Sequence, residues 1–333
     1  MVVINKFGLN IKMNSLNLHT YQPDILGDDY QQLTLNFADD YDGKVVATLV
    51  RKKANQATKK AVLYIHGFAD YFFQTEMAEQ FNQQGYDFYA LDLRKYGRSK
   101  LPHQKLYYVL DLREYDAEIS KALEIIGQEN HNQVLLAGHS TGGLITTLYA
   151  AHYPDHRLIK AVWANSPFYD FYKSTIEKKV GIPLLSKVGK RLPNAKFPSG
   201  LNQWYTPSLH KAFYGEWDFN LNWKPKSVPF VRLCFVHAIH EAQKEIHHGI
   251  HLNVPILIMH SHQSKYPKKW GVDAQQSDVI LDVKDMTHNA KKMKGDVQTL
   301  AIHNGLHDLV LSAPAVREQV YKDLFAWLEK KVH

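Results

Sequence analysis

The sequence contains one cysteine, Cys234, among 333 residues. A single cysteine cannot form a disulfide within the chain, so a disulfide-stapled secreted fold is excluded and a reducing compartment is favoured. Long apolar runs are also missing, because the most apolar segments, such as VPILIM, are far shorter than the roughly 20 residues of a membrane-spanning helix. The opening stretch MVVINKFGLNIKMN lacks the basic, apolar and small-residue regions of a signal peptide. We therefore expect a cytoplasmic protein with no integral membrane segment.

No nucleic-acid-binding motif accompanies the formal charge of +7, and the lysines occur in short scattered clusters such as RKK and KKMK. We expect a solvated basic surface and no nucleic-acid partner. The nineteen histidines raise the question of a metal, but HEAQK has Lys244 where a zinc-binding H-E-x-x-H needs its second histidine. His247 and His251 could share a helix face, but no third ligand follows at a recognisable spacing. We therefore expect no metal site.

Strand-like and helix-like segments alternate along much of the chain. Two β-branched segments joined by the turn-rich ADDYDG predict a hairpin over 31–52. Further strands are expected at 61–67, 87–93, 133–138, 158–165, 254–261 and 296–305, and helices at 71–84, at 112–128, directly after 138 and from 313 onward. This alternation predicts an α/β fold with a mostly parallel central sheet and helices on both faces.

The alternation stops between 167 and 252, where prolines, glycines and aromatic residues dominate. We expect this segment to be an inserted cap, with 1–166 and 253–333 forming the two parts of the core. The aromatic stretches of the cap are PFYDFY, NQWYTP and AFYGEWDFNLNW. These rings could line an acyl pocket or form a small core within the cap, and the sequence leaves both readings open. If they line the pocket, Trp204 and Trp217 should affect chain-length preference.

The segment GHSTGG at 138–143 places Ser140 between glycines, after an expected strand and before an expected helix. This context is that of a nucleophile elbow, in which small neighbours let a strained serine rise above the sheet. The helix that follows would favour negative charge developing at the serine. Ser140 is therefore our candidate nucleophile.

A serine nucleophile needs a general base and an oxyanion hole. His307 is our candidate base because it lies in a loop just after the last expected strand. His303 is the competitor, but we expect it to lie within that strand and to pack against the core. We expect the oxyanion to be held by the backbone N–H of Thr141, which follows the nucleophile, and by that of Phe68 in the segment HGF.

These segments resemble the α/β-hydrolase superfamily, in particular its branch of serine-aminopeptidase-like and monoglyceride-lipase or lysophospholipase-like enzymes. The resemblance is carried by HGF at His66, ALDLRKYGRSKLP, GHSTGG at Gly138 and GLHDLVLS around His307, which cover the expected core but not the cap. It implies the α/β-hydrolase fold and a triad in the order Ser…Asp…His. Lys95 stands where many relatives carry glycine, and we expect this difference to lie at the surface.

The acid departs from the family pattern. Relatives carry the aspartate a few residues after the strand that corresponds to VPILIMH, where this chain has Ser264. The later string SDVILDV resembles the continuation that follows the aspartate in relatives, which implies that an insertion has displaced the acid to Asp278. Asp282 is the second candidate, at a position that often starts a helix, and Asp273 is the third. Asp308 is too close in sequence to the base to orient its ring.

The predicted function is that of a serine hydrolase that cleaves carboxylic esters through an acyl-enzyme, with no cofactor. The expected substrate is a small-molecule ester with an apolar acyl part, such as a monoacyl lipid. One alternative is a peptidase that acts on small peptides or amides with the same triad. The other is a non-catalytic ligand-binding protein, although such a relative would usually have lost a triad or oxyanion residue. The sequence makes no prediction of the oligomeric state.

Overall fold

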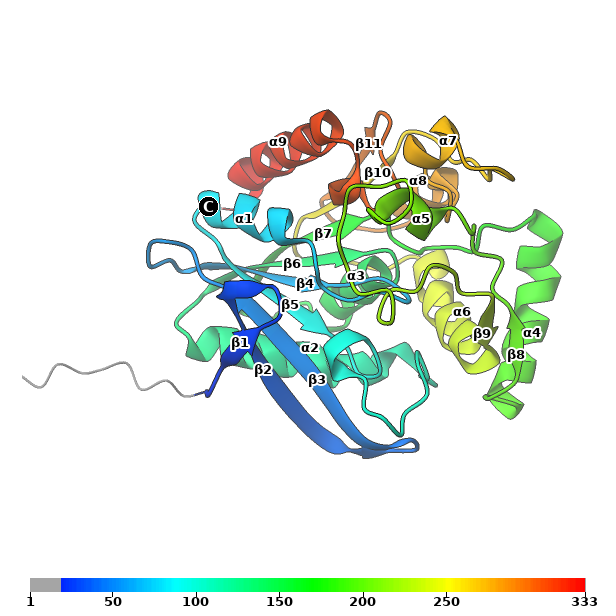
Figure 1. Ribbon diagram of the computed structural model, residues 1–333, viewed down its shortest axis with the longest axis horizontal. Helices are drawn as coiled ribbons and strands as arrows, with labels where there is room; N and C mark the ends of the chain where they lie inside the picture. The colour runs from blue at the N-terminus through cyan, green and yellow to red at the C-terminus, as the bar shows by residue number, and fades with distance from the viewer. Residues whose placement is uncertain (1–18, 333) are drawn as a thin grey trace, which may run out of the picture.

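The computed structural model describes residues 19–332, so the opening stretch considered above for a signal peptide lies outside the described residues. Its central feature is a nine-stranded sheet with the strand order β1-β2-β3-β5-β4-β6-β7-β10-β11 (Figure 1). The pairs β1–β2, β2–β3 and β3–β5 are antiparallel, and every later pair is parallel. The predicted hairpin and the mostly parallel sheet are therefore confirmed.

The strands of this sheet are β1 (Gln22–Asp24), β2 (Gly27–Asp40), β3 (Gly43–Lys52), β4 (Lys60–Ile65), β5 (Asp87–Asp92), β6 (Gln133–His139), β7 (Ile159–Asn165), β10 (Ile256–Ser261) and β11 (Val297–Ile302). A separate two-stranded sheet pairs β8 (Lys196–Pro198) with β9 (Phe230–Arg232). The α-helices are α1 (Thr75–Gln83), α2 (Asp116–Gln128), α3 (Thr141–His152), α4 (Ile182–Arg191), α5 (Tyr205–Leu209), α6 (Leu233–His248), α7 (Val272–Gln275), α8 (Val283–Ala290) and α9 (Pro314–Lys331). The shorter helical turns are η1 (Gly97–Ser99), η2 (Leu112–Tyr115), the π-turn η3 (Glu177–Gly181) and η4 (Leu309–Leu311).

Helices cover both faces of the sheet because successive strand residues point to opposite sides. On β4, Val62 and Tyr64 pack in one apolar cluster with residues of α1 and α9. Their neighbours Leu63 and Ile65 pack in a second cluster with residues of α2, α3 and α6. Figure 1 shows α9 and α1 together on one side of the sheet and α2 on the other. Because both faces are covered, the central strands are buried along almost their whole length.

The segment expected to form a cap contains α4, α5, α6 and the short strands β8 and β9. In Figure 1, α4 stands at the edge of the molecule beside α6. The helix α6 buries Phe235, Ile239 and Ile246 in the same cluster as the central strands, so its apolar face contributes to the core. The division into 1–166, 167–252 and 253–333 stays a prediction. Among residues 19–332, no helix combines the length and the apolar character that crossing a membrane requires.

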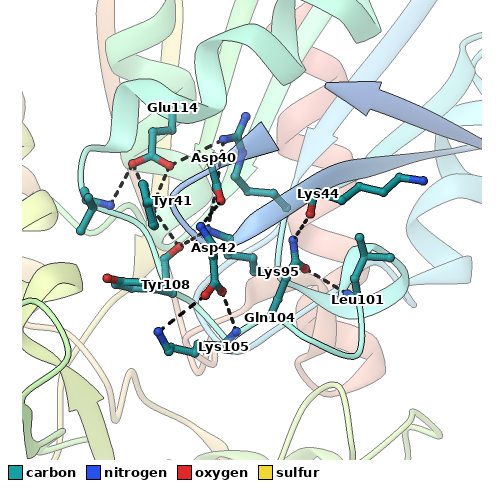
Figure 2. Close-up of polar contacts among 12 residues, drawn as sticks. Asp40, Tyr41, Asp42, Lys44, Lys95, Leu101, Gln104, Lys105, Tyr108 and Glu114 are labelled. Atoms are coloured by element: carbon teal, nitrogen blue, oxygen red, sulfur yellow. Dashed lines mark hydrogen bonds and ion pairs between the residues drawn. The ribbon is translucent and has the colours of Figure 1, made fainter. Parts of the chain in front are cut away.

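Lys95 is buried, so the expectation of a surface position was wrong. Only 1% of the residue is exposed, and its φ of 66° lies in the left-handed region that favours glycine. Its Nζ donates to Asp40 Oδ2 at 2.7 Å and to the carbonyl oxygen of Tyr108 at 2.9 Å (Figure 2). The lysine therefore links the end of the β2–β3 hairpin to the loop after β5. Local sequence does not reveal this position, because Asp40 is 55 residues away along the chain.

Candidate active site

Ser140 lies in a sharp turn between β6 and α3, with a φ of 55° and a ψ of −114°. A non-glycine residue in such a conformation costs on the order of 1–3 kcal/mol and persists only where its surroundings enforce it. The surroundings here are two glycines. A Cβ on Gly138 would come within 2.3 Å of the Gly142 carbonyl oxygen, and a Cβ on Gly142 within 2.2 Å of the Ile65 carbonyl oxygen. The glycines thus permit the close packing of β6, α3 and β4 that holds the serine in its turn.

The structure brings Ser140, His307 and Asp278 together in one chain of hydrogen bonds. The His307 Nδ1 lies 2.8 Å from Asp278 Oδ2, and its Nε2 lies 3.0 Å from Ser140 Oγ. A carboxylate can only accept, so Nδ1 carries the proton and Nε2 is left to accept from the serine hydroxyl. The three residues are buried, with exposed fractions of 7% for Ser140, 2% for His307 and 0% for Asp278. This is the arrangement in which an imidazole can take a proton from serine.

Asp278 is held from two sides. Its Oδ1 accepts from the backbone N–H groups of Ile280 and Leu281, each at 2.8 Å. Its backbone N–H donates to the Gln263 carbonyl oxygen at 3.0 Å, and its carbonyl oxygen accepts from the Lys265 N–H at 3.0 Å. The second carboxylate oxygen is therefore free to accept from the imidazole in a fixed orientation.

The other candidate acids lie elsewhere. The Asp282 side chain caps α8 by accepting from the Lys284 N–H at 3.0 Å. Asp273 is exposed in the first turn of α7. The Asp308 side chain is buried and accepts from Gln74 Nε2 at 3.1 Å and from Asn165 Nδ2 at 2.8 Å.

His303 does not pack against the core, so this part of the expectation was wrong. The strand β11 ends at Ile302, and His303 follows it as an exposed residue. Its ring stacks on that of His262 with centroids 4.4 Å apart. Strand periodicity could not place this residue, because the strand was expected to reach 305 and ends three positions earlier, at Ile302.

The proposed oxyanion residues line one cavity with the serine and the histidine. Phe68, Ser140, Thr141 and His307 all contribute to its wall. Thr141 is the first residue of α3, so its backbone N–H belongs to the positive end of that helix. Most of the remaining wall is apolar, with Phe168, Phe171, Phe197, Phe235, Ile182 and Leu281 among its side chains. The cavity therefore has a polar end that contains Ser140 and His307, and the rest of its wall is mostly apolar.

The aromatic stretches of the segment 167–252 play different parts. Phe168, Phe171 and Tyr172 of PFYDFY and Tyr205 of NQWYTP line the cavity. Trp204 and Trp217 are not part of its wall, so the pocket reading, one of the two left open, does not apply to them. The Trp217 indole donates to the Leu311 carbonyl oxygen at 3.0 Å and packs against the cluster around α9. Sequence alone could not distinguish aromatic residues that line the cavity from those that pack in a core, since both roles favour the same residue types.

Burial lowers the pKa of His307 below its ordinary value of 6.5, although the Asp278 carboxylate opposes that shift. A second histidine, His139, lies next to it, with ring centroids 4.8 Å apart. A lowered pKa keeps the imidazole neutral, which is the form that accepts a proton from serine.

Among residues 19–332, one group of side chains has donors that a metal could use, namely Asp70, His139 and Asp308. The group fits a metal poorly, because Asp70 already pairs with the Lys224 ammonium at 3.0 Å. Two histidines of the segment 167–252 contact protein groups instead. His240 contacts Ser186 Oγ at 3.1 Å, and the His247 Nε2 donates to the Tyr169 carbonyl oxygen at 2.8 Å.

Comparison with known proteins gives relatives of the same fold. The structure resembles monoglyceride lipase from Saccharomyces cerevisiae, solved as a soluble variant with a substrate analogue, with a TM-score of 0.69 and 20% identity over 94% of this chain and 99% of that one. It also resembles a monoacylglycerol lipase from Paleococcus ferrophilus, with a TM-score of 0.63 and 19% identity over 84% of this chain and 98% of that one. These likenesses show that the chain has the α/β-hydrolase fold.

Relatives by sequence cover shorter stretches. The probable lysophospholipase L2 of Haemophilus influenzae is 31% identical over 137 residues, which are 40% of this chain and 43% of that protein. Epoxide hydrolase 4 of Mus musculus is 30% identical over 115 residues, which are 34% of this chain and 30% of that protein. The matched stretch thus spans less than half the length of these curated relatives.

One family matches more than half of the chain. Residues 56–269 match the family described as Serine aminopeptidase, S33. The match includes Phe68, Ser140 and Thr141, and it ends before Asp278 and His307. With the fold and the resemblance in its motifs, this match shows that the chain belongs to the serine aminopeptidase family of α/β-hydrolases.

Proposed function

We propose that the protein hydrolyses carboxylic esters with an apolar acyl part, through an acyl-enzyme on Ser140. The observation that carries the proposal is the hydrogen-bonded chain of Ser140, His307 and Asp278 at the polar corner of an apolar cavity. A buried serine beside a correctly oriented imidazole is suited to nucleophilic catalysis. The apolar wall is suited to an acyl chain.

In the proposed reaction, His307 Nε2 takes the proton of the Ser140 hydroxyl as Oγ attacks the ester carbonyl carbon. The negative charge on the carbonyl oxygen is stabilised by the backbone N–H groups of Phe68 and Thr141. His307 then gives its proton to the leaving alcohol, and the acyl group stays on the serine. A water molecule, deprotonated by the same imidazole, releases the acid in the second half of the cycle. Asp278 keeps the imidazole in the tautomer that makes both transfers possible.

Relatives that are named as lipases support an acyl ester as the substrate class. Two structural relatives are named as a monoglyceride lipase and a monoacylglycerol lipase, and one sequence relative is a probable lysophospholipase. Those names belong to the relatives. For this chain, the support is that the cavity wall offers an acyl chain phenylalanine and aliphatic side chains.

An aminopeptidase activity is the alternative that the family description raises. Such an enzyme must bind a positively charged α-amino group, which calls for a carboxylate that faces the substrate. The acidic residue in the described cavity wall is Asp70, and its negative charge is already balanced by the Lys224 ammonium, 3.0 Å from Oδ1. We therefore favour esters over peptides.

Activity-based labelling tests the proposal. A fluorophosphonate probe should label Ser140, and Ser140→Ala should remove both labelling and the turnover of p-nitrophenyl esters while the far-UV circular dichroism spectrum stays unchanged. Ester binding without turnover would support the non-catalytic alternative. Labelling at another serine, or turnover by the alanine variant, would refute the assignment of the nucleophile.

A further inference from the structure

Lys224 is a buried lysine in the segment 167–252, and it lies beside the catalytic cavity. Only 3% of the residue is exposed, and it contributes to the same cavity wall as Ser140. Its Nζ lies 3.0 Å from Asp70 Oδ1. Burial of an ammonium group is unfavourable unless the charge is paired, so Asp70 is what stabilises Lys224 at this position.

Asp70 follows the proposed oxyanion residue Phe68 in the loop after β4, and it is 1% exposed. Its Oδ2 has no hydrogen-bond partner among the described residues. Burial acts to raise the pKa of the Asp70 carboxyl, but the neighbouring Lys224 ammonium and His139 outweigh it and hold the pKa well below its usual range. The carboxyl is therefore ionised, and Lys224 is the lysine that pairs with it.

The ion pair belongs to a larger contact between the segment 219–224 and the loop after β4. The Trp223 ring meets the Tyr71 ring edge-on with centroids 5.0 Å apart. The backbone N–H of Asn220 donates to the Tyr71 hydroxyl oxygen at 2.7 Å. Lys224 and Asp70 are the charged members of this contact. The segment that carries the lysine is thus fixed on the loop that carries the oxyanion donor.

The pairing affects the charge balance of the proposed reaction. The transition state places a negative charge next to the Phe68 N–H, and Asp70 is a second negative charge on the same buried loop. An unpaired carboxylate there would disfavour the oxyanion, because charges in a poorly solvated site interact strongly. Lys173 also lines the cavity, but its side chain is 37% exposed and lies 4.0 Å from Glu177. It is therefore poorly placed to replace Lys224.

We propose that Lys224 is a positioning residue for the reaction, in that it neutralises Asp70 and holds the Phe68 loop in the orientation that receives the oxyanion. The inference rests on the proposed ester hydrolysis at Ser140. Lys224 acts through Asp70 and not by contact with the reacting atoms. It follows that the loss of Lys224 should be harmful mainly while Asp70 keeps its charge.

The test compares kcat, KM and Tm of five variants with those of the wild-type protein, using p-nitrophenyl butyrate. Lys224→Met should lower kcat by at least about tenfold, with KM changed by less than about threefold, because an interaction of the transition state is weakened. Lys224→Arg keeps the charge and should retain most of kcat. The double variant Asp70→Asn with Lys224→Met should regain kcat to within about threefold of Asp70→Asn alone. Lys226→Met, at an exposed lysine of the same segment, is the matched control and should behave as wild type.

Two results would contradict the inference. A Lys224→Met protein with wild-type kcat and a lowered Tm would show that the ion pair between Lys224 and Asp70 contributes only to stability. A double variant that stays as slow as Lys224→Met would show that the lysine acts on the substrate and not through Asp70. Should Lys224→Met fail to fold, Lys224→Arg and the double variant still decide, since neither leaves an unpaired carboxylate. A wild-type protein that is neither labelled at Ser140 nor active on esters would instead refute the proposed function itself.

Discussion

The substitution Asp278→Asn removes the charge of the proposed acid and also reverses a hydrogen bond. In the wild-type protein, Oδ1 of Asp278 accepts from two backbone N–H groups, those of Ile280 and Leu281, and Oδ2 accepts from His307 Nδ1. An asparagine would keep its single oxygen on the two N–H groups and turn its NH2 toward His307. The imidazole would then have to accept at Nδ1 and carry its proton on Nε2. In that tautomer, Nε2 cannot take the proton of Ser140.

The expected loss follows from this change of tautomer. Removal of the orienting acid in serine triads costs about 10⁴ in kcat, or about 5.5 kcal/mol of transition-state stabilisation. We therefore expect Asp278→Asn to lower kcat for p-nitrophenyl butyrate by about a thousandfold or more, measured against a Ser140→Ala background. Asp282→Asn is the matched control, because asparagine caps a helix as well as aspartate and should leave kcat nearly unchanged. Retention of more than a tenth of kcat by Asp278→Asn, or a larger loss in Asp282→Asn, would refute the reasoning.

Three further predictions concern pH, chain length and metals. Because His307 must be neutral to act and burial lowers its pKa, the acid limb of kcat/KM should have its midpoint below 6.5, and a midpoint above 6.5 would contradict the assignment of this base. Phe171→Ala should change the ratio of kcat/KM values between butyrate and laurate esters, because this ring lines the cavity. Trp217→Ala, outside the wall, should leave that ratio unchanged and lower the free energy of unfolding by about 2 kcal/mol, somewhat less than the loss of a fully buried tryptophan. Ester turnover should survive prolonged EDTA treatment, and activity that disappears with EDTA and returns with zinc would mean that a metal has been overlooked.

Local patterns in the sequence predicted most of the fold and the candidate nucleophile. Strand and helix periodicity located the sheet because its central strands are buried on both faces. The elbow around Ser140 could be recognised because its glycines and its serine lie within five consecutive residues, 138–142. Asp278 and His307 required the order of elements as well, and the structure brings both to Ser140. The errors concern contacts between distant segments. Lys95 is buried because Asp40 reaches it.

The same limit explains the residues that the sequence did not single out. Asp70 and Lys224 are 154 positions apart, and no local pattern distinguishes that lysine from the exposed Lys226. The only available signal was that Asp70 closely follows HGF, at the end of a buried strand. The sequence also did not show which aromatic rings line the cavity and which pack elsewhere, because only the tertiary structure distinguishes the two positions. Secondary-structure propensity depends on residues that are close in sequence. Whether a charged side chain is buried depends on contacts with residues that are distant in sequence.

The two backbone hydrogen bonds that Asp278 forms with Gln263 and Lys265 affect how freely the neighbouring loop can change in length. They close the base of the loop between β10 and the acid, so the loop beyond them can change in length without moving the carboxylate. The entropic cost of a longer loop is small, about 0.6 kcal/mol for each doubling. The chain could thus acquire or shed residues here while the triad keeps its geometry. The position of the Asp278 carboxylate therefore does not depend on the number of residues in this loop. The loop is a suitable place to insert a reporter peptide.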